Sequence, residues 1–164
     1  MTVDQPVSTA PRRRPRLRGR VAIGAALAGL ILGLSAGPAL AGTAYSSWGY
    51  FSVAGTSYRN MAYVYADTTG SGSAKASTDA GPTSGTVGSG WVGARGRLFT
   101  SGGSLSCEGS NTYNSSSLTT SQVVTGASCW RYSHGAWYSY GVALGWNGSG
   151  YNSVYTFVSP NQNS

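Results

Sequence analysis

The chain is poor in ionisable side chains. Only 9% of its 164 residues are charged, with four acidic residues and one histidine. A serine nucleophile needs a neighbouring base, and glycoside hydrolysis needs two carboxyl groups across the scissile bond. His134, Asp67, Asp79 and Glu108 are the whole supply beyond residue 41, and none of them stands in a catalytic motif. The composition therefore predicts that the protein is not an enzyme.

Metal-ligand patterns are also missing. The chain has two cysteines, Cys107 and Cys129, and no Cys-x-x-Cys or His-x-x-x-His spacing that would suit zinc. A metal pair or a reactive thiol therefore has little support, and no metal or other cofactor is expected. In an exported chain, two cysteines most simply form one disulfide. Such a bond would stabilise the fold by about 3 kcal/mol.

Basic charge is scarce outside one N-terminal segment. Six of the eleven basic residues lie between Arg12 and Arg20, an apolar run follows over 21–34, and Ala39-Leu40-Ala41 has the small-x-small pattern of a cleavage site. This order predicts a cleaved signal peptide over residues 1–41 and a secreted, extracellular protein. A membrane anchor is the alternative, which the helix-breaking Gly37-Pro38 disfavours.

Signal removal also removes most of the positive charge. Residues 42–164 keep five basic and three acidic side chains out of a chain whose formal charge is +7. Nucleic-acid binding needs many clustered cations to neutralise phosphates. No nucleic-acid partner is expected, and no membrane attachment after cleavage.

Alternating residues and turn signals are abundant. Residues 135–160 form a predicted β-hairpin around Asn147-Gly148-Ser149-Gly150, with an aromatic-bearing face that we expect to be buried and a small or polar face. A second predicted hairpin spans 90–107, with its turn at 101–103 and with Arg95 and Arg97 on the same side. A further strand over 60–66 places Met61, Tyr63 and Tyr65 on one face.

No stretch beyond residue 41 shows a helical period. The pattern predicts an all-β fold, a small antiparallel sandwich or barrel of about 7–8 strands with one disulfide. We expect one β domain over 42–164, with a flexible lead at 42–48. Residues 68–89 are rich in Gly, Ser, Thr and Ala, which predicts a long loop or a small-residue edge strand around 74–78.

Aromatic residues are in surplus. Five Trp, eleven Tyr and three Phe all lie beyond residue 41, more than one small core can hide. Exposed Tyr and Trp bind protein partners and sugar rings well, because they offer a large area with few rotamers to freeze. The alternative is that most of them fill the core and that the arginines form a solvated strand face. The candidate binding residues are Tyr45, Trp48, Trp91, Arg95, Arg97 and Trp137.

Several short motifs carry a resemblance. They are the run 90–99, GWVGARGRLF, the run 103–107, GSLSC, then Tyr113-Asn114 and Cys129, and finally 147–151, NGSGY, with 155–157, YTF. In these the chain resembles small secreted actinobacterial β-domain proteins, including the adaptor subunit of umbrella toxin particles. The resemblance implies partners that are lectin-like and toxin-bearing secreted subunits, and it supplies no catalytic motif.

Three functions stay open at this point. The first is a secreted non-catalytic interaction or adaptor domain, which could link the subunits of an extracellular antibacterial toxin particle. The second is a module that binds cell-wall or polymer carbohydrate through a Trp/Tyr face. The third is a small secreted toxin or protease inhibitor.

Overall fold

The computed structural model describes residues 41–164, which form sixteen β-strands and no helix. The predicted signal peptide, residues 1–41, lies outside the described residues except for Ala41. The described part of the chain contains no helix that could span a membrane. The predicted all-β class is confirmed, and the strands form two packed layers.

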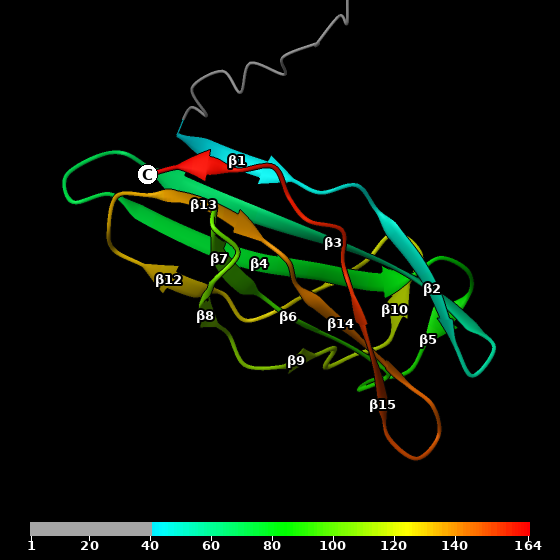
Figure 1. The fold of residues 1–164 in the computed structure, drawn as a ribbon. Helices are drawn as coiled ribbons and strands as arrows, with labels where there is room; N and C mark the ends of the chain where they lie inside the picture. Colours follow the sequence, from blue (N-terminus) through cyan, green and yellow to red (C-terminus); the bar gives the residue numbers. More distant parts are fainter. Residues whose placement is uncertain (1–40) are drawn as a thin grey trace, which may run out of the picture. The chain divides into compact units, whose positions relative to one another are not determined.

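The first layer is built on the long hairpin of β3 and β4, which pair antiparallel along their whole length (Figure 1). β1 and β2 pair with successive parts of β3, and β11 and β12 pair with successive parts of β4. The layer is therefore four strands wide. Its strands are β1 (Gly42–Tyr45), β2 (Gly49–Val53), β3 (Thr56–Asp67), β4 (Ser73–Pro82), β11 (Val124–Thr125) and β12 (Cys129–Arg131).

The second layer consists of two short sheets in the orders β15-β14-β6-β9 and β16-β13-β7-β8. The chain runs directly from one sheet into the other, so together they make four broken strands side by side. Hydrogen bonds bridge the breaks, since Tyr140 N–H donates to the Arg97 carbonyl at 3.3 Å and Thr156 N–H to the Gly141 carbonyl at 3.1 Å. The strands are β6 (Val92–Arg95), β7 (Arg97–Thr100), β8 (Leu105–Glu108), β9 (Thr112–Tyr113), β13 (Ala136–Ser139), β14 (Val142–Trp146), β15 (Tyr151–Tyr155) and β16 (Gln162–Asn163).

Two layers of four strand positions match the predicted sandwich of about 7–8 strands. The sheets end in open edges, so the structure decides for a sandwich over a barrel. The higher number of separate strands reflects breaks along these positions, among them those at Gly96 and Gly141, and a small ribbon of β5 (Thr86–Val87) and β10 (Leu118–Thr119) adds to it. Both predicted turns are present. They join β7 to β8 and β14 to β15.

The layers approach most closely where the second layer is broken. A Cβ on Gly96 would lie 2.6 Å from the Ala76 carbonyl oxygen of β4, and a Cβ on Gly141 would overlap the Thr78 hydroxyl. Ser77 and Thr78 are fully buried at this seam. The glycines that break the strands are therefore the residues that let the two backbones meet, because no other residue lacks a Cβ.

The core on either side of the seam consists mainly of small side chains. One cluster includes Val53, Tyr58 and Ala143, and the other includes Val64, Leu98 and Trp137. The alternation was predicted correctly, but the buried face was not. The glycine- and alanine-bearing face of β14 is inside, and Tyr65 of β3 and Tyr151 and Tyr155 of β15 lie outside. Close approach of the layers at the seam leaves no room for rings there, and the buried rings of Tyr58 and Trp137 belong to the clusters on either side of it.

Two expectations about irregular segments need correction. Residues 42–45 of the expected flexible lead form β1, with Gly42 opposite Ala66 and Tyr45 opposite Tyr63. Of the two expectations for 68–89, a long loop or a small-residue edge strand around 74–78, the strand is present as β4, but it is paired on both sides and is the strand nearest the seam. Small residues mark β4 because it lies under the other layer, not because it is irregular.

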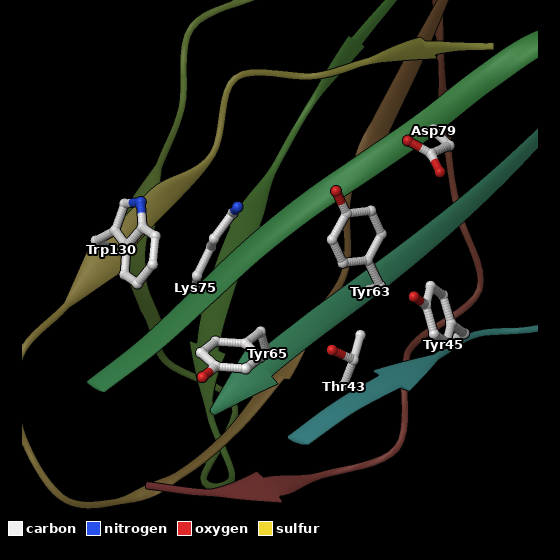
Figure 2. A pocket seen from close by; sticks show the side chains of 7 residues that line it. All are labelled: Thr43, Tyr45, Tyr63, Tyr65, Lys75, Asp79 and Trp130. Carbon is white, nitrogen blue, oxygen red and sulfur yellow. The ribbon is translucent and has the colours of Figure 1, made fainter. Parts of the chain in front are cut away.

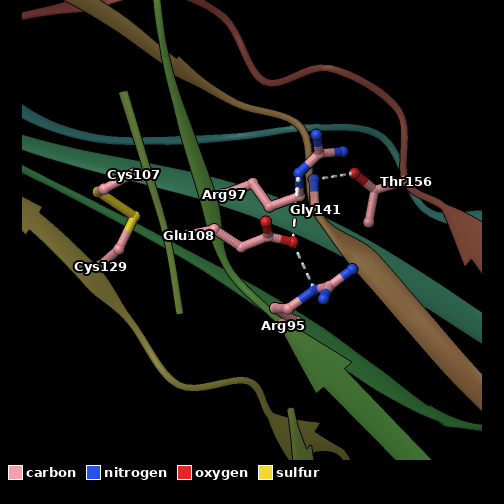
Figure 3. Close-up of polar contacts among 7 residues, drawn as sticks. All are labelled: Arg95, Arg97, Cys107, Glu108, Cys129, Gly141 and Thr156. Atoms are coloured by element: carbon pink, nitrogen blue, oxygen red, sulfur yellow. Dashed lines mark hydrogen bonds and ion pairs between the residues drawn. A yellow bond between two sulfur atoms is a disulfide. The ribbon is translucent and has the colours of Figure 1, made fainter. Parts of the chain in front are cut away.

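One disulfide ties the two layers together at an edge. Cys107 belongs to β8 of the second layer and Cys129 to β12 of the first, with 5.9 Å between their Cα atoms (Figure 3). The predicted bond is confirmed. It closes the edge formed by β8 and β12, whereas the β15 end of the second layer has no covalent tie to the first layer within the described residues.

Candidate functional site

The outer face of the first layer is hollowed. Its hollow has a cavity volume of about 530 Å³. Alternation brings its residues to one side of four neighbouring strands: β1, β3, β4 and β12. Figure 2 shows the rings set around the open centre. The residues that line this hollow are Thr43, Tyr45, Tyr63, Tyr65, Lys75, Asp79 and Trp130.

Polar groups in the hollow are few and of opposite charge. Burial raises the pKa of the Asp79 carboxyl above its usual value, although the Thr125 hydroxyl, which donates to Oδ1 at 2.7 Å, lowers it in part. Burial also raises the pKa of the Tyr63 phenol, with a smaller contribution from the Asp79 charge. Lys75 Nζ lies 5.3 Å from the centre of the Trp130 ring. The hollow thus contains one cation, Lys75, and one partly desolvated carboxylate, Asp79.

The outer face of the second layer carries rings that touch one another. Phe99 stacks on Tyr138 with ring centres 5.3 Å apart, and Tyr140 stacks on Tyr155 at 5.1 Å. Tyr151 lies 4.6 Å from Tyr113, and its hydroxyl donates to the Gly90 carbonyl at 2.5 Å. These contacts fill the spaces between the rings. Tyr155 nevertheless stays 54% exposed, and Tyr113 and Tyr151 stay 37% exposed.

Two arginines and one glutamate lie on this same face (Figure 3). Glu108 Oε1 is 2.7 Å from Arg95 Nε and 3.6 Å from Arg97 Nε. The Arg97 guanidinium also lies 4.9 Å from the Phe99 ring centre and 5.5 Å from that of Tyr155. The prediction that Arg95 and Arg97 share a side is confirmed, and both are held by an internal partner.

Strand β15 is a free edge. Thr156 N–H donates to Gly141, so the alternation of an antiparallel pair directs the N–H and C=O groups of Tyr151, Ser153 and Tyr155 away from β14. No described strand pairs with that side. The Tyr155 carbonyl accepts a bond from the Asn60 amide at 3.4 Å, which leaves Ser153 at the middle of an open edge.

The remaining sequence candidates have different surroundings. Trp137 is a correction, because it is only 6% exposed and its indole N–H donates to Ser164 Oγ at 2.9 Å. It belongs to the core. Trp48 is half-buried, with the Arg59 guanidinium 4.7 Å from its ring centre. Trp91 is 43% exposed at the start of β6, and Tyr45 is 54% exposed in the hollow.

The carboxylates that catalysis or metal binding would require close together lie far apart in the fold. Asp67 accepts from Thr69 at a turn, Asp79 from Thr125 in the hollow, and Glu108 is paired with arginines on the other layer. Among residues 41–164, no group of three or more His, Cys, Asp or Glu side chains could hold a metal ion. The three carboxylates therefore serve three separate local environments.

Sequence reasoning missed part of the hollow. It placed Tyr63 and Tyr65 on one strand face but did not identify Trp130, Lys75 or Asp79 as their neighbours. The register of β12 on β4 places Trp130 opposite Lys75, and that of β4 on β3 places Lys75 opposite Tyr65. Period-2 alternation of residues 73–79 would have put Lys75 and Asp79 on one face. Only pairing across the sheet adds Trp130.

Comparisons of the chain with protein-family models, with curated proteins and with solved structures found no match.

Proposed function

We propose that the protein is a secreted, non-catalytic recognition domain whose free β15 edge receives an extended segment of another secreted protein. The observation that carries this proposal is the open, uncharged edge at β15. Residues 151–158, YNSVYTFV, contain no charged residue and no proline. Proteins normally protect such an edge with lysine, proline or a covering segment, because its unpaired backbone groups pair with other chains.

The chemistry of the edge defines the partner. A strand added beside β15 would bond to the backbone of Tyr151 and Ser153 and would place alternate side chains on the aromatic outer face. Ser153 leaves a gap between Tyr151 and Tyr155 on that face. A large apolar side chain of the partner fits this gap, and the exposed Phe157, at 58%, extends the contact surface.

The surrounding face has the composition of a protein interface. Tyrosine, tryptophan and arginine are enriched where binding energy concentrates, and this face carries Tyr113, Tyr151, Tyr155, Trp91 and Arg97. The Arg95–Glu108–Arg97 cluster leaves one net positive charge on it. The resemblance of the sequence to umbrella particle adaptors supports partners that are secreted subunits, with the domain linking one to another.

The test is a change confined to the edge. Ser153→Pro removes an N–H that points away from β14, so it blocks an added strand without removing an internal bond. Ser153→Val is the matched control, which keeps the N–H and favours the strand. The secreted protein is used to capture partners from its native culture fluid, and cross-links are mapped by mass spectrometry.

We expect cross-links between β15 and an extended partner segment for the native chain and for Ser153→Val, and their loss for Ser153→Pro at unchanged thermal midpoint. A partner retained by Ser153→Pro would overturn the proposal. So would a sedimentation experiment in which the native chain forms a dimer that Ser153→Pro disrupts, because the edge would then pair two copies of this chain.

A further inference from the structure

The hollow on the first layer shares no residue with the β15 edge and needs its own explanation. Its cavity volume of about 530 Å³ falls in the range of small-molecule sites. Three tyrosines and one tryptophan line it, and Tyr45, Tyr65 and Trp130 are 54%, 37% and 41% exposed. The Tyr45–Tyr63 pair is tilted by 42° with centres 5.5 Å apart, and Trp130 stacks on Tyr132, which does not line the hollow, with centres 6.1 Å apart.

The charges of the hollow select among ligand classes. An aromatic cage with a carboxylate would suit a quaternary ammonium ion, but Lys75 lies within the same hollow and repels a cation. Asp79 in turn repels an anion. With one charge of each sign, the site favours a neutral ligand that can both accept a hydrogen bond from Lys75 and donate one to Asp79.

The hydrogen-bonding groups stand next to ring faces. Asp79 Oδ1 accepts from Thr125, and its second oxygen has no hydrogen-bond partner among the described residues. Thr43 and the tyrosine hydroxyls can donate or accept, and Figure 2 shows the Tyr63 hydroxyl between Lys75 and Asp79. A sugar ring has both required features, because its C–H groups pack on an aromatic face while its hydroxyls reach the polar groups around it.

We propose that this hollow binds a neutral saccharide, with its ring faces packed on Tyr65 and Trp130 and its hydroxyls bonded to Lys75 and Asp79. Pyranose units with equatorial hydroxyls present the flattest C–H faces, so β-linked glucose or N-acetylglucosamine chains are the best fit. Tyr45, Tyr65 and Trp130, which line the hollow, are exposed to solvent, as binding within a polymer requires.

The experiment is calorimetric titration of the secreted protein with cellohexaose and with chitohexaose. We expect at least one of them to bind, and Trp130→Ala and Tyr65→Ala each to weaken binding by tenfold or more. Tyr50→Ala is the matched control, because Tyr50 is 74% exposed on β2 and does not line the hollow. Lys75→Met tests the hydrogen-bonding role separately from ring packing.

Two further probes decide the ligand class. Choline chloride and a hexuronate oligomer are titrated under the same conditions, and neither is expected to bind. If choline or the hexuronate oligomer binds more tightly than both hexasaccharides, the proposal is overturned. It is also overturned if neither hexasaccharide binds at millimolar concentration. Saccharide binding that survives Trp130→Ala and Tyr65→Ala would overturn it as well, because the sugar would then lie elsewhere.

Discussion

The outer faces of the two layers carry the same kind of residue and differ in what the rings touch. On the first layer, Tyr65 stands opposite Thr43 and Lys75, so narrow neighbours leave a hollow beside the ring. On the second layer, Phe99 stands opposite Tyr138 and Trp146 opposite Tyr151, so rings cover rings. The cross-strand partner therefore decides what a ring touches, and Tyr45, which stands opposite Tyr63, has a ring as its neighbour even on the first layer.

The open edges of the two layers differ in a similar way. At one side, the disulfide joins β8 to β12 and ties the layers together. At the opposite side of the second layer, β15 pairs only with β14, and its outer side touches the first layer through the amide of Asn60. The edge at β8 and β12 is therefore held covalently, whereas the outer side of β15 keeps backbone groups that no described strand pairs.

The largest expected loss of stability comes from a substitution that forces the two layers apart at the seam. Gly141→Val would force a side chain into Thr78 at the seam, where neither backbone can move away without disturbing its own sheet. We expect a loss of about 3 kcal/mol or more in the free energy of unfolding, with both faces lost together. Urea denaturation measures it. Gly150→Val is the matched control, since nothing lies within 4 Å of a Cβ there and its φ is not positive.

Removing the covalent tie has the next largest expected effect. The double substitution of Cys107 and Cys129 by serine should lower the free energy of unfolding by about 3 kcal/mol, because the unfolded chain regains the freedom of a loop of 22 residues. Native-state hydrogen exchange should show the loss first in β8 and β12. Equal loss of protection at β15 would contradict the assignment of the disulfide to one edge.

Two equally exposed tyrosines test whether ring contacts contribute more to stability on the second layer than on the first. Tyr45 and Tyr155 are both 54% exposed, but Tyr155 stacks on Tyr140 and receives the Arg97 guanidinium, whereas Tyr45 makes one tilted contact. We expect Tyr155→Ala to cost about 1 kcal/mol more unfolding free energy than Tyr45→Ala, from one stacked pair and one cation–π contact. Equal costs would show that ring contacts do not distinguish the faces.

Substitution of Asp79 has the smallest expected effect on the free energy of unfolding, and the size of this effect depends on pH. Burial raises its pKa in the folded state, so the folded protein binds more protons than the unfolded one and Asp79 lowers stability as pH rises through that range. Asp79→Asn should therefore be more stable than the native chain at pH 7, and the difference should shrink as pH falls toward 4. Thermal unfolding across pH 3–8 measures it.

Asp67 is the control with the opposite sign. Hydrogen bonds from the backbone and side chain of Thr69 lower its pKa, so its contribution is present at neutral pH and is lost as pH falls through the lowered value. Asp67→Asn should be less stable than the native chain at pH 7, and the two should converge in acid. If Asp79→Asn and Asp67→Asn both raised or both lowered stability at pH 7, burial and hydrogen bonding would not be the causes of the two opposite pKa shifts.

Much of the candidate site was within reach of the sequence, because alternation and turn residues are local. They placed Tyr63 with Tyr65 and Arg95 with Arg97, and both turns were found. Alternation and turn residues could not show which of the two faces of each strand is buried. Aromatic content favoured burial for the ring-bearing face of β14, but the seam at Gly96 and Gly141 reversed it. Trp137, predicted as a contact residue, is buried because its end of the sandwich lies away from the seam.

By itself, the sequence determined the all-β class, the hairpin turns and the cysteine pair, since these depend on residue type and on spacings of a few positions. Only the tertiary structure decided which face each strand buries, that the outer side of β15 has no partner strand, and that Trp130 meets Tyr65 and Lys75 across β4. The reason is physical. Alternation fixes that two faces differ, whereas the register between distant strands and the distance between the layers fix what each face touches.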